Sequence, residues 1–167
     1  YPDLPIVGIE PAIKPAAKNH EGGRIVVMAT SVTLRRPKFA HLMESFRQSA
    51  EIISMACPSI VDFVEKDKMN SQELMNYLTK KFAALGDRPA DAVVLGCTHY
   101  PFIAEAIQKA AGPQAVLYDG SEGVAREIRR RLAEKNLLAD ADNSLNLEII
   151  NSSGPEMVAL TKRLLVV

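Results

Sequence analysis

Three side chains that can do chemistry stand together at Cys97-Thr98-His99, directly after the apolar run Val93–Leu95 and a glycine. The apolar run predicts a buried strand, and Pro101 is typical of the first turn of a helix. Cys97 would then lie between the carboxyl end of a strand and the amino end of a helix. Helix N–H groups and a nearby imidazole both favour a thiolate, so Cys97 is a candidate nucleophile or proton-transfer group.

A free cysteine after an apolar strand also fits a small buried hydrophobic residue, and this alternative stays open for Cys97 on spacing alone. The only other cysteine, Cys57, has no CxxC or metal-ligand spacing to Cys97. The pair therefore predicts free thiols in a reducing compartment, the cytoplasm, rather than a disulfide. We expect Cys57 to be buried and chemically inert.

Composition excludes several function classes. The 167 residues carry 20 basic and 20 acidic side chains, so no net field favours nucleic acid or a membrane surface. No apolar run approaches the roughly 20 residues that span a bilayer. The first residues, Tyr1 to Pro5, show no basic and apolar leader, which agrees with a cytoplasmic protein.

Apolar runs alternate with helical patterns along the whole chain. We expect strands at Ile6–Ile9, Arg24–Ala29, Ile52–Ala56, Val93–Leu95, Ala115–Tyr118 and Leu145–Ile150. We expect helices at Ala12–Lys18, Pro37 to about Ala50, Ile60–Val64, Ser71 to about Leu85, Phe102–Ala111, Glu122–Asn136 and Glu156–Leu164. This order predicts an α/β fold, a parallel sheet with helices on both faces. No GxGxxG or P-loop motif follows a strand, so nucleotide binding has no support.

Polar residues follow several of the expected strands, at the edge where ligands gather in such sheets. They are Thr30, Ser31, Thr33, Cys57, Cys97, Thr98, His99, Asp119 and Ser121. We therefore expect the chemistry of this chain at the carboxyl ends of its strands.

The run Gly96-Cys97-Thr98-His99-Tyr100-Pro101 resembles the second-cysteine motif of the glutamate racemases, within the aspartate/glutamate racemase superfamily. The segment from Ala29 to Arg35 resembles the family's ATxxT stretch, and Cys57-Pro58 followed by Val64-Glu65 resembles the stretch that carries an active-site acid. The resemblance covers nearly the whole chain. GCTHYP is its specific part, and the others gain weight from their order.

The resemblance implies cofactor-independent interconversion of L- and D-glutamate, without metal, by two cysteine bases that act on opposite faces of the α-carbon. It implies that Cys97, His99 and Glu65 are catalytic. It implies that Thr98, Thr30 and Thr33 bind substrate. Two alternatives from the residues stay open: the Thr30 and Thr33 hydroxyls could cap a helix near Leu34, and the Glu65 carboxylate could be a solvated charge.

One departure from the family is large, because its first cysteine motif, of the CNT type, does not occur in this sequence. The resemblance then implies a second racemase domain at 1–112 and a segment at 113–167 that would complete the first domain. We expect the chain alone to be inactive and the full-length enzyme to supply D-glutamate for peptidoglycan. Exposed edges of an unfinished sheet predict a homodimer.

Two alternatives to this function stay open. One is a non-catalytic stand-alone α/β domain that binds a carboxylated ligand or a partner. The other is a racemase for another acidic amino acid, such as aspartate. With the resemblance, a cell-wall-precursor activator is a further candidate partner.

Overall fold

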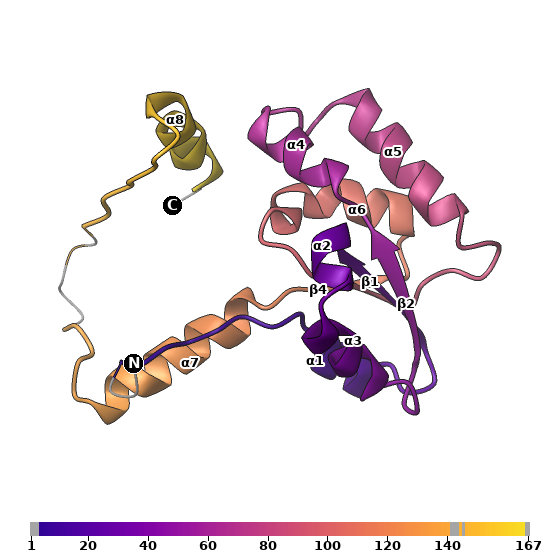
Figure 1. Ribbon diagram of the computed structural model, residues 1–167, viewed down its shortest axis with the longest axis horizontal. Coiled ribbons are helices and arrows are strands. Elements are labelled where there is room, and N and C mark those ends of the chain that lie inside the picture. Colours follow the sequence, from indigo (N-terminus) through magenta and orange to yellow (C-terminus); the bar gives the residue numbers. More distant parts are fainter. Residues whose placement is uncertain (1–3, 141–143, 145, 166–167) are drawn as a thin grey trace. The chain divides into compact units, whose positions relative to one another are not determined.

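The computed structural model describes residues 4–140, 144 and 146–165, and four parallel strands form the sheet in this part of the chain (Figure 1). The strands are β1 Arg24–Ala29, β2 Glu51–Ala56, β3 Ala92–Leu95 and β4 Val116–Tyr118, in the order β2-β1-β3-β4. All three pairings are parallel. The predicted α/β class with a parallel sheet is confirmed.

Helices cover both faces of this sheet (Figure 1). Helices α1 (Ile13–Asn19) and α3 (Pro37–Glu44) lie on one face. Helices α4 (Ser59–Glu65), α5 (Gln72–Ala83) and α6 (Ala104–Ala111) lie on the other. Parallel strands need crossover connections, and α3, α4, α5 and α6 lie in them, whereas α1 precedes β1.

The central strands are buried on both faces, which explains their continuous apolar sequences. Every residue of β1 and of β3 is buried. Alternate side chains of the two strands, Ile25, Val27 and Val94 among them, belong to a core cluster with Ile13 of α1 and Phe39 of α3. Because successive side chains of a strand point to opposite faces, β1 and β3 each pack against both helical layers.

Two short helical pieces follow the two central strands. Helix α2, Ser31–Leu34, comes after β1, and the 3₁₀ turn η1, Tyr100–Ile103, comes after β3 and leads into α6. The predicted helix Phe102–Ala111 therefore begins with a 3₁₀ turn, with Pro101 in its first turn as expected.

A buried arginine fixes the amino edge of the sheet. The Arg24 guanidinium donates to the carbonyl oxygen of Leu85 at 3.0 Å and to that of Arg88. Its Nε forms an ion pair with Glu51 at 3.4 Å, although the alignment is too poor for a hydrogen bond. The backbone N–H of Arg24 donates to the Asp91 carboxylate at 2.7 Å. Arg24 thus ties β1 to the loop that enters β3.

Contacts divide the chain into two compact units, Glu10–Gly120 and a second formed by Tyr1–Ile9 with Ser121–Val167. The second unit contains α7 (Ser121–Glu134) and α8 (Pro155–Leu164). The predicted boundary after residue 112 stays a prediction, and β4 pairs with β3 in the sheet of the first unit.

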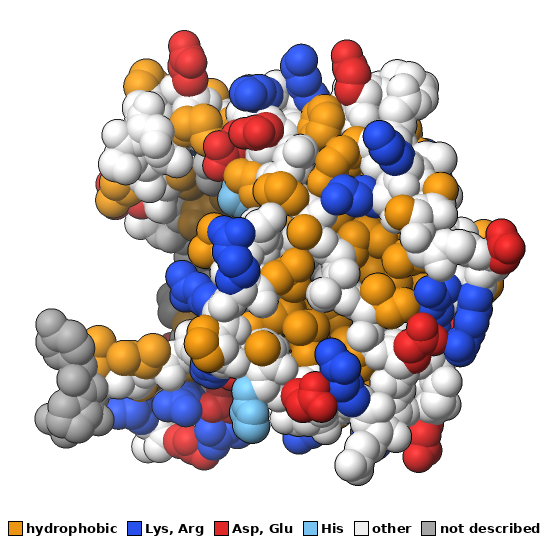
Figure 2. Space-filling view, turned by 45° about the vertical axis from the view of Figure 1, so that its right-hand side comes forward, with side chains coloured by type: hydrophobic (Ala, Val, Ile, Leu, Met, Phe, Trp, Pro, Cys, Tyr) orange, Lys and Arg blue, Asp and Glu red, His pale blue; other side chains and the backbone are white. Residues whose placement is uncertain are grey.

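Arginines of α7 are paired with acids of the same helix. Glu127 accepts hydrogen bonds from Arg130 and Arg131, which lower its pKa to about 2. Arg126 pairs with Glu122 one turn away. On the face that Figure 2 shows, basic and acidic side chains are interspersed in the same way.

Two predicted strands are wrong. Ile6–Ile9 has no strand structure, and Ile6 and Ile9 are more than half exposed. In Leu145–Ile150, Leu145 lies outside the described residues and the other five residues have no strand structure. A strand exists only when a neighbour pairs with it, and neither run has a paired neighbour within the described residues.

The helix predicted from Pro37 to about Ala50 is also too long, because α3 ends at Glu44. Ser45 bonds the carbonyl oxygen of His41 through its hydroxyl at 2.9 Å, and Ser49 bonds that of Phe46 in the same way at 3.0 Å. Serine side chains that bond nearby carbonyls compete with helix continuation, and turns follow here.

Candidate active site

The site begins at a close backbone approach between β3 and β1. The N–H of Gly96 donates to the carbonyl oxygen of Met28 at 2.8 Å. A Cβ at Gly96 would lie 2.7 Å from that oxygen, closer than real contacts allow. Only glycine therefore lets the chain leave β3 along this path, and Cys97 comes next.

Cys97, His99 and Glu65 form a linked row. The Cys97 Sγ lies 3.8 Å from Nδ1 of His99, and the His99 Nε2 lies 3.2 Å from Oε1 of Glu65. An ionised carboxylate can only accept, so the Nε2 of His99 carries the proton. In the neutral imidazole the Nδ1 lone pair then faces the thiol and can accept its proton.

All three side chains of this row reach solvent. Cys97 and His99 are partly exposed, and the Glu65 side chain is 48% exposed. A substrate could therefore approach the thiol without the fold opening. The row brings together the three residues that the sequence predicted as catalytic, although Glu65 lies on α4 and far from the other two in sequence.

Thr30 directly follows β1 and caps α2, and Thr33 lies within that helix. The Thr30 hydroxyl accepts from the backbone N–H of Thr33 at 3.3 Å, and the two hydroxyl oxygens lie 3.0 Å apart. Thr30 is therefore a helix N-cap, which was the alternative to substrate binding. Capping does not exclude substrate binding, since a hydroxyl can both donate and accept.

The sheet order places these residues at one edge of the sheet, beside its switch point. From β1 the chain crosses to β2 on one side and then returns past β1 to β3, so the switch point of the sheet lies between β1 and β3. Met28 pairs with Leu95, and Thr30 and Cys97 each follow two residues later. Thr98, next to Cys97, is exposed.

Cys57 is not part of this row. It is fully buried, and burial raises the pKa of its thiol to about 11, so the thiol is protonated near neutral pH. Its backbone carbonyl instead accepts a hydrogen bond from the hydroxyl of Tyr100 at 2.8 Å. Sequence reasoning missed Gly96 and Tyr100 as separate contributors, although both belong to the GCTHYP run.

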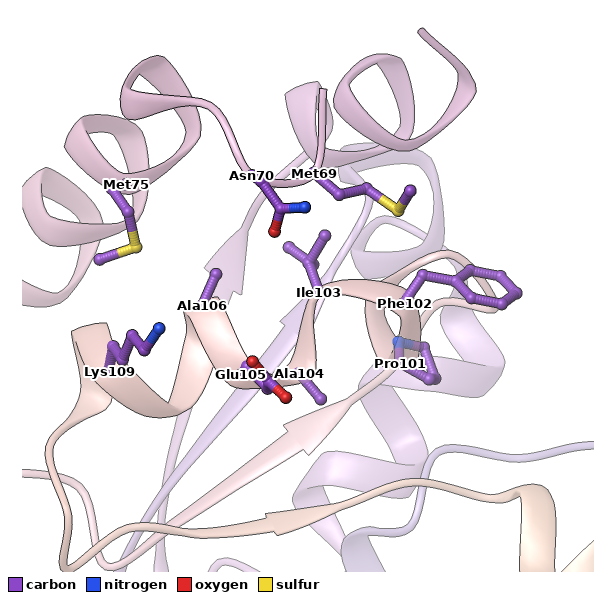
Figure 3. A pocket seen from close by; sticks show the side chains of 10 residues that line it. All are labelled: Met69, Asn70, Met75, Pro101, Phe102, Ile103, Ala104, Glu105, Ala106 and Lys109. Carbon is purple, nitrogen blue, oxygen red and sulfur yellow. The ribbon is translucent and has the colours of Figure 1, made fainter. Parts of the chain in front are cut away.

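A cavity of about 450 Å³ lies next to this run but outside the row (Figure 3). Met75 on α5 and Lys109 on α6 lie on its walls, together with Pro101, Phe102 and Ile103 of η1. None of the residues that line it is a predicted site residue. Among the described residues, no group of three or more His, Cys, Asp or Glu could hold a metal ion.

Residues 2–128 match the family model described as Asp/Glu/Hydantoin racemase, which is most of the chain. The chain belongs to the Asp/Glu/Hydantoin racemase family. The resemblance predicted from GCTHYP is thereby confirmed at the level of the family. None of the helices that the structure describes is long and apolar enough to cross a membrane.

Within the Asp/Glu/Hydantoin racemase family, a glutamate racemase of Clostridium perfringens is 42% identical over 166 residues. The match covers 99% of this chain and 64% of that protein. The chain therefore spans a little under two thirds of the length of the curated relatives it matches.

Two solved structures share the fold of this family member. Escherichia coli glutamate racemase, in complex with L-glutamate and the activator UDP-MurNAc-Ala, gives a TM-score of 0.79 at 25% identity, covering 97% of this chain and 62% of that one. Francisella tularensis glutamate racemase, in complex with D-glutamate, gives 0.62 at 26% identity, covering 72% and 45%.

Proposed function

We propose that this chain carries one half of the active site of a glutamate racemase, in which Cys97 is the base for one face of the α-carbon. The observation that carries the proposal is the row of Glu65, His99 and Cys97 at the switch point of the sheet. Membership of the family and relatives named glutamate racemase support the reaction class.

Proton transfer can be derived from the row itself. His99 takes the thiol proton of Cys97 at Nδ1, while the Glu65 carboxylate holds Nε2–H and stabilises the imidazolium. The thiolate then removes the α-proton of glutamate and becomes a thiol again, which leaves a carbanion on the substrate. Return of a proton to the opposite face inverts the α-carbon.

The opposite face requires a second base, because one rigid thiol cannot reach both faces. Cys57 is the only other cysteine, and it is fully buried with a protonated thiol. We assign the second thiol to a segment that the longer relatives have in addition to the part matched here. On this basis the chain alone does not racemise glutamate.

Hydroxyl groups beside the thiol account for substrate binding. Thr30 and Thr33 face each other at the end of β1, and Thr98 is exposed next to Cys97. These hydroxyls can accept from the ammonium group of an amino acid and donate to its carboxylate. Structures of two relatives hold L- or D-glutamate, which supports glutamate as the substrate.

The domain division belongs to the same proposal. Residues 1–112 act as the second racemase domain, and residues 113–167 complete a first domain together with a segment like the part of the longer relatives that lies outside the match. Support comes from α7, where Ile128 and Leu132 are 43% and 38% exposed beside a hollow of about 430 Å³. An amphipathic helix with such a stripe normally packs against a partner element.

The test is racemisation and α-hydrogen exchange of L- and D-glutamate in deuterium oxide. The chain is measured alone and co-expressed with the part of the Clostridium perfringens racemase that lies outside the match. We expect racemisation only from the combination, abolished by Cys97→Ser and retained by Cys57→Ala. Full turnover by the chain alone would contradict the half-site, and an active Cys97→Ser variant would contradict the role of the thiol.

Two controls sharpen this experiment. L-aspartate as substrate separates a glutamate racemase from a racemase for other acidic amino acids. Ile128→Asp with Leu132→Asp should prevent complementation if α7 contacts the added segment, whereas Glu134→Gln on the same helix should not. Binding of glutamate without exchange in any combination would favour a non-catalytic binding domain.

The biological setting follows from the reaction. D-glutamate made in the cytoplasm would supply peptidoglycan synthesis, and an activator of the cell-wall-precursor class would report demand for it. The Escherichia coli relative holds such an activator. Addition of UDP-MurNAc-Ala to the complemented enzyme tests activation, and light scattering tests whether the complemented enzyme forms a homodimer.

A further inference from the structure

Tyr100 is fully buried at the start of η1, between the partly exposed His99 and the rest of the turn. Its hydroxyl donates to the carbonyl oxygen of Cys57 at 2.8 Å, and Cys57 is also fully buried. Burial holds the pKa of Tyr100 well above its usual range, so the hydroxyl keeps its proton and remains a donor. The hydroxyl can therefore donate this bond throughout the neutral pH range.

This bond spans two strands that are not neighbours. Cys57 directly follows β2 and Tyr100 lies a few residues beyond β3, whereas β1 separates these strands in the sheet. The N–H of Cys57 in turn donates to the carbonyl of Ala29, the last residue of β1, at 2.9 Å. Tyr100 thus connects the ends of all three strands at the edge that carries the site.

The two segments joined by Tyr100 carry the two ends of the catalytic row. The segment from residue 57 leads through α4 to Glu65, and the segment from residue 97 contains Cys97 and His99. Within the described part of the chain, two hydrogen bonds link residues 57–65 to residues 97–103. They are the Tyr100–Cys57 bond and the His99–Glu65 bond.

These two bonds differ in their ability to fix geometry. Glu65 and His99 are 48% and 29% exposed, and exposed pairs of this kind hold their partners only weakly. The Tyr100 hydroxyl and the Cys57 carbonyl are shielded from water. Breaking their bond leaves the hydroxyl without a partner in an apolar place and leaves the carbonyl only the backbone N–H of Ile60, at 3.3 Å. The buried bond is therefore the firmer of the two hydrogen bonds, and it acts together with the packing of Ile60 and Val64 of α4.

We propose that Tyr100 is a positioning residue: by holding the Cys57 carbonyl, its hydroxyl keeps α4 where Glu65 orients the His99 imidazole towards Cys97. The proposal rests on the proposed function of the row and adds a residue that does not touch the substrate. Tyr100→Phe tests the role of the hydroxyl alone, because the phenylalanine ring still fills the same place in the core.

Nitrogen NMR of the His99 ring in the full 167-residue chain tests the proposal without any assay of activity. The spectra compare wild type with Tyr100→Phe, Glu65→Gln and a matched control, Ile107→Val, which trims a fully buried side chain of α6. In wild type the neutral ring should carry its proton on Nε2. In Tyr100→Phe the Nδ1–H form should rise at least about threefold, as in Glu65→Gln.

The outcomes decide the proposal directly. A wild-type ring in Tyr100→Phe would overturn it, and an equal change in Ile107→Val would also overturn it, because general loosening would then explain the effect. The signals of His20 and His41 serve as internal references that should not move.

Alkylation of Cys97 gives a second measurement. Glu65→Gln should slow the reaction of Cys97 with iodoacetamide about threefold or more in wild type and have no further effect in Tyr100→Phe. An undiminished Glu65 effect in Tyr100→Phe would count against the proposal. If the complemented chain shows no racemisation while this coupling is present, the proposed function fails and the positioning role of Tyr100 stands.

Discussion

The backbone of Gly96 reaches the carbonyl oxygen of Met28 so closely that no side chain fits between them. The N–H of Gly96 donates at 2.8 Å, and a Cβ on the same residue would lie 2.7 Å from that oxygen. The Gly96 nitrogen and the Met28 oxygen are both backbone atoms at the ends of two paired central strands. These strands cannot move apart without loss of pairing.

Gly96→Ala should therefore destabilise the fold by about 1–3 kcal/mol, since one strand end must shift. Urea unfolding measures this loss. Gly123→Ala in α7 is the control, because a Cβ there meets nothing within 4 Å and alanine favours a helix by about 1 kcal/mol. An unchanged unfolding midpoint for Gly96→Ala would mean that the strand ends tolerate displacement.

The two cysteines should differ sharply in reactivity. Burial raises the pKa of Cys57 to about 11, so at pH 8 only about one part in a thousand of its thiol is ionised, and it is also inaccessible. We expect iodoacetamide to modify Cys97 alone in the native chain and both cysteines in urea. Mass spectrometry of the modified peptides shows which thiol reacted, and early modification of Cys57 would disprove its burial.

Alkaline pH should weaken the fold through Cys57. Its pKa is raised from the ordinary 9.0 to about 11, so the unfolded chain loses this proton first as pH rises. The associated stability is complete below about pH 9, falls between about pH 9 and 11, and amounts to at most about 2–3 kcal/mol.

Urea unfolding at several pH values measures this loss. Tyr77, whose pKa is raised to about 12 mainly by burial, adds a similar loss at higher pH. Cys57→Ala should remove the earlier part of the slope and leave the later part. A slope identical to that of wild type would assign the whole alkaline loss to other groups.

Arg24→Met should destabilise the chain by about 2–4 kcal/mol, because the carbonyl oxygens of Leu85 and Arg88 lose a charged donor and Glu51 loses its buried partner. Thermal unfolding measures the change. Arg47→Met is a suitable control, since the ion pair of Arg47 with Glu44 is exposed. Equal stability of the two variants would show that the Arg24 network contributes little.

Sequence pattern predicted the sheet where burial on both faces left a continuous apolar run, as in Arg24–Ala29 and Val93–Leu95. It failed for Ile6–Ile9, because an apolar run states what a strand would bury but not whether a neighbour is present to pair with it. The helix predicted beyond Glu44 failed for another reason. Hydrophobic periodicity does not detect a serine hydroxyl that bonds a backbone carbonyl, as that of Ser45 does.

The site residues also divide into those that the sequence predicted and those that it did not. The types and spacing of Cys97 and His99 are local, so the sequence alone pointed to them. The partner of His99 was proposed only through the family resemblance, because Glu65 reaches it from the end of α4, which follows a different strand. The close approach at Gly96 and the bond from Tyr100 to Cys57 depend on strand order, which no local pattern encodes.

The pairing of β1 with β3 also has a kinetic consequence. These strands are neighbours in the sheet, yet α2, α3, β2, α4 and α5 all lie between them in the sequence. Closing so long a loop is slow compared with forming the local β1–β2 crossover, so the turn that contains Cys97 should acquire its native shape late in refolding. Until then this thiol is as open to oxidants as in a denatured chain, and refolding yields should depend on added reductant.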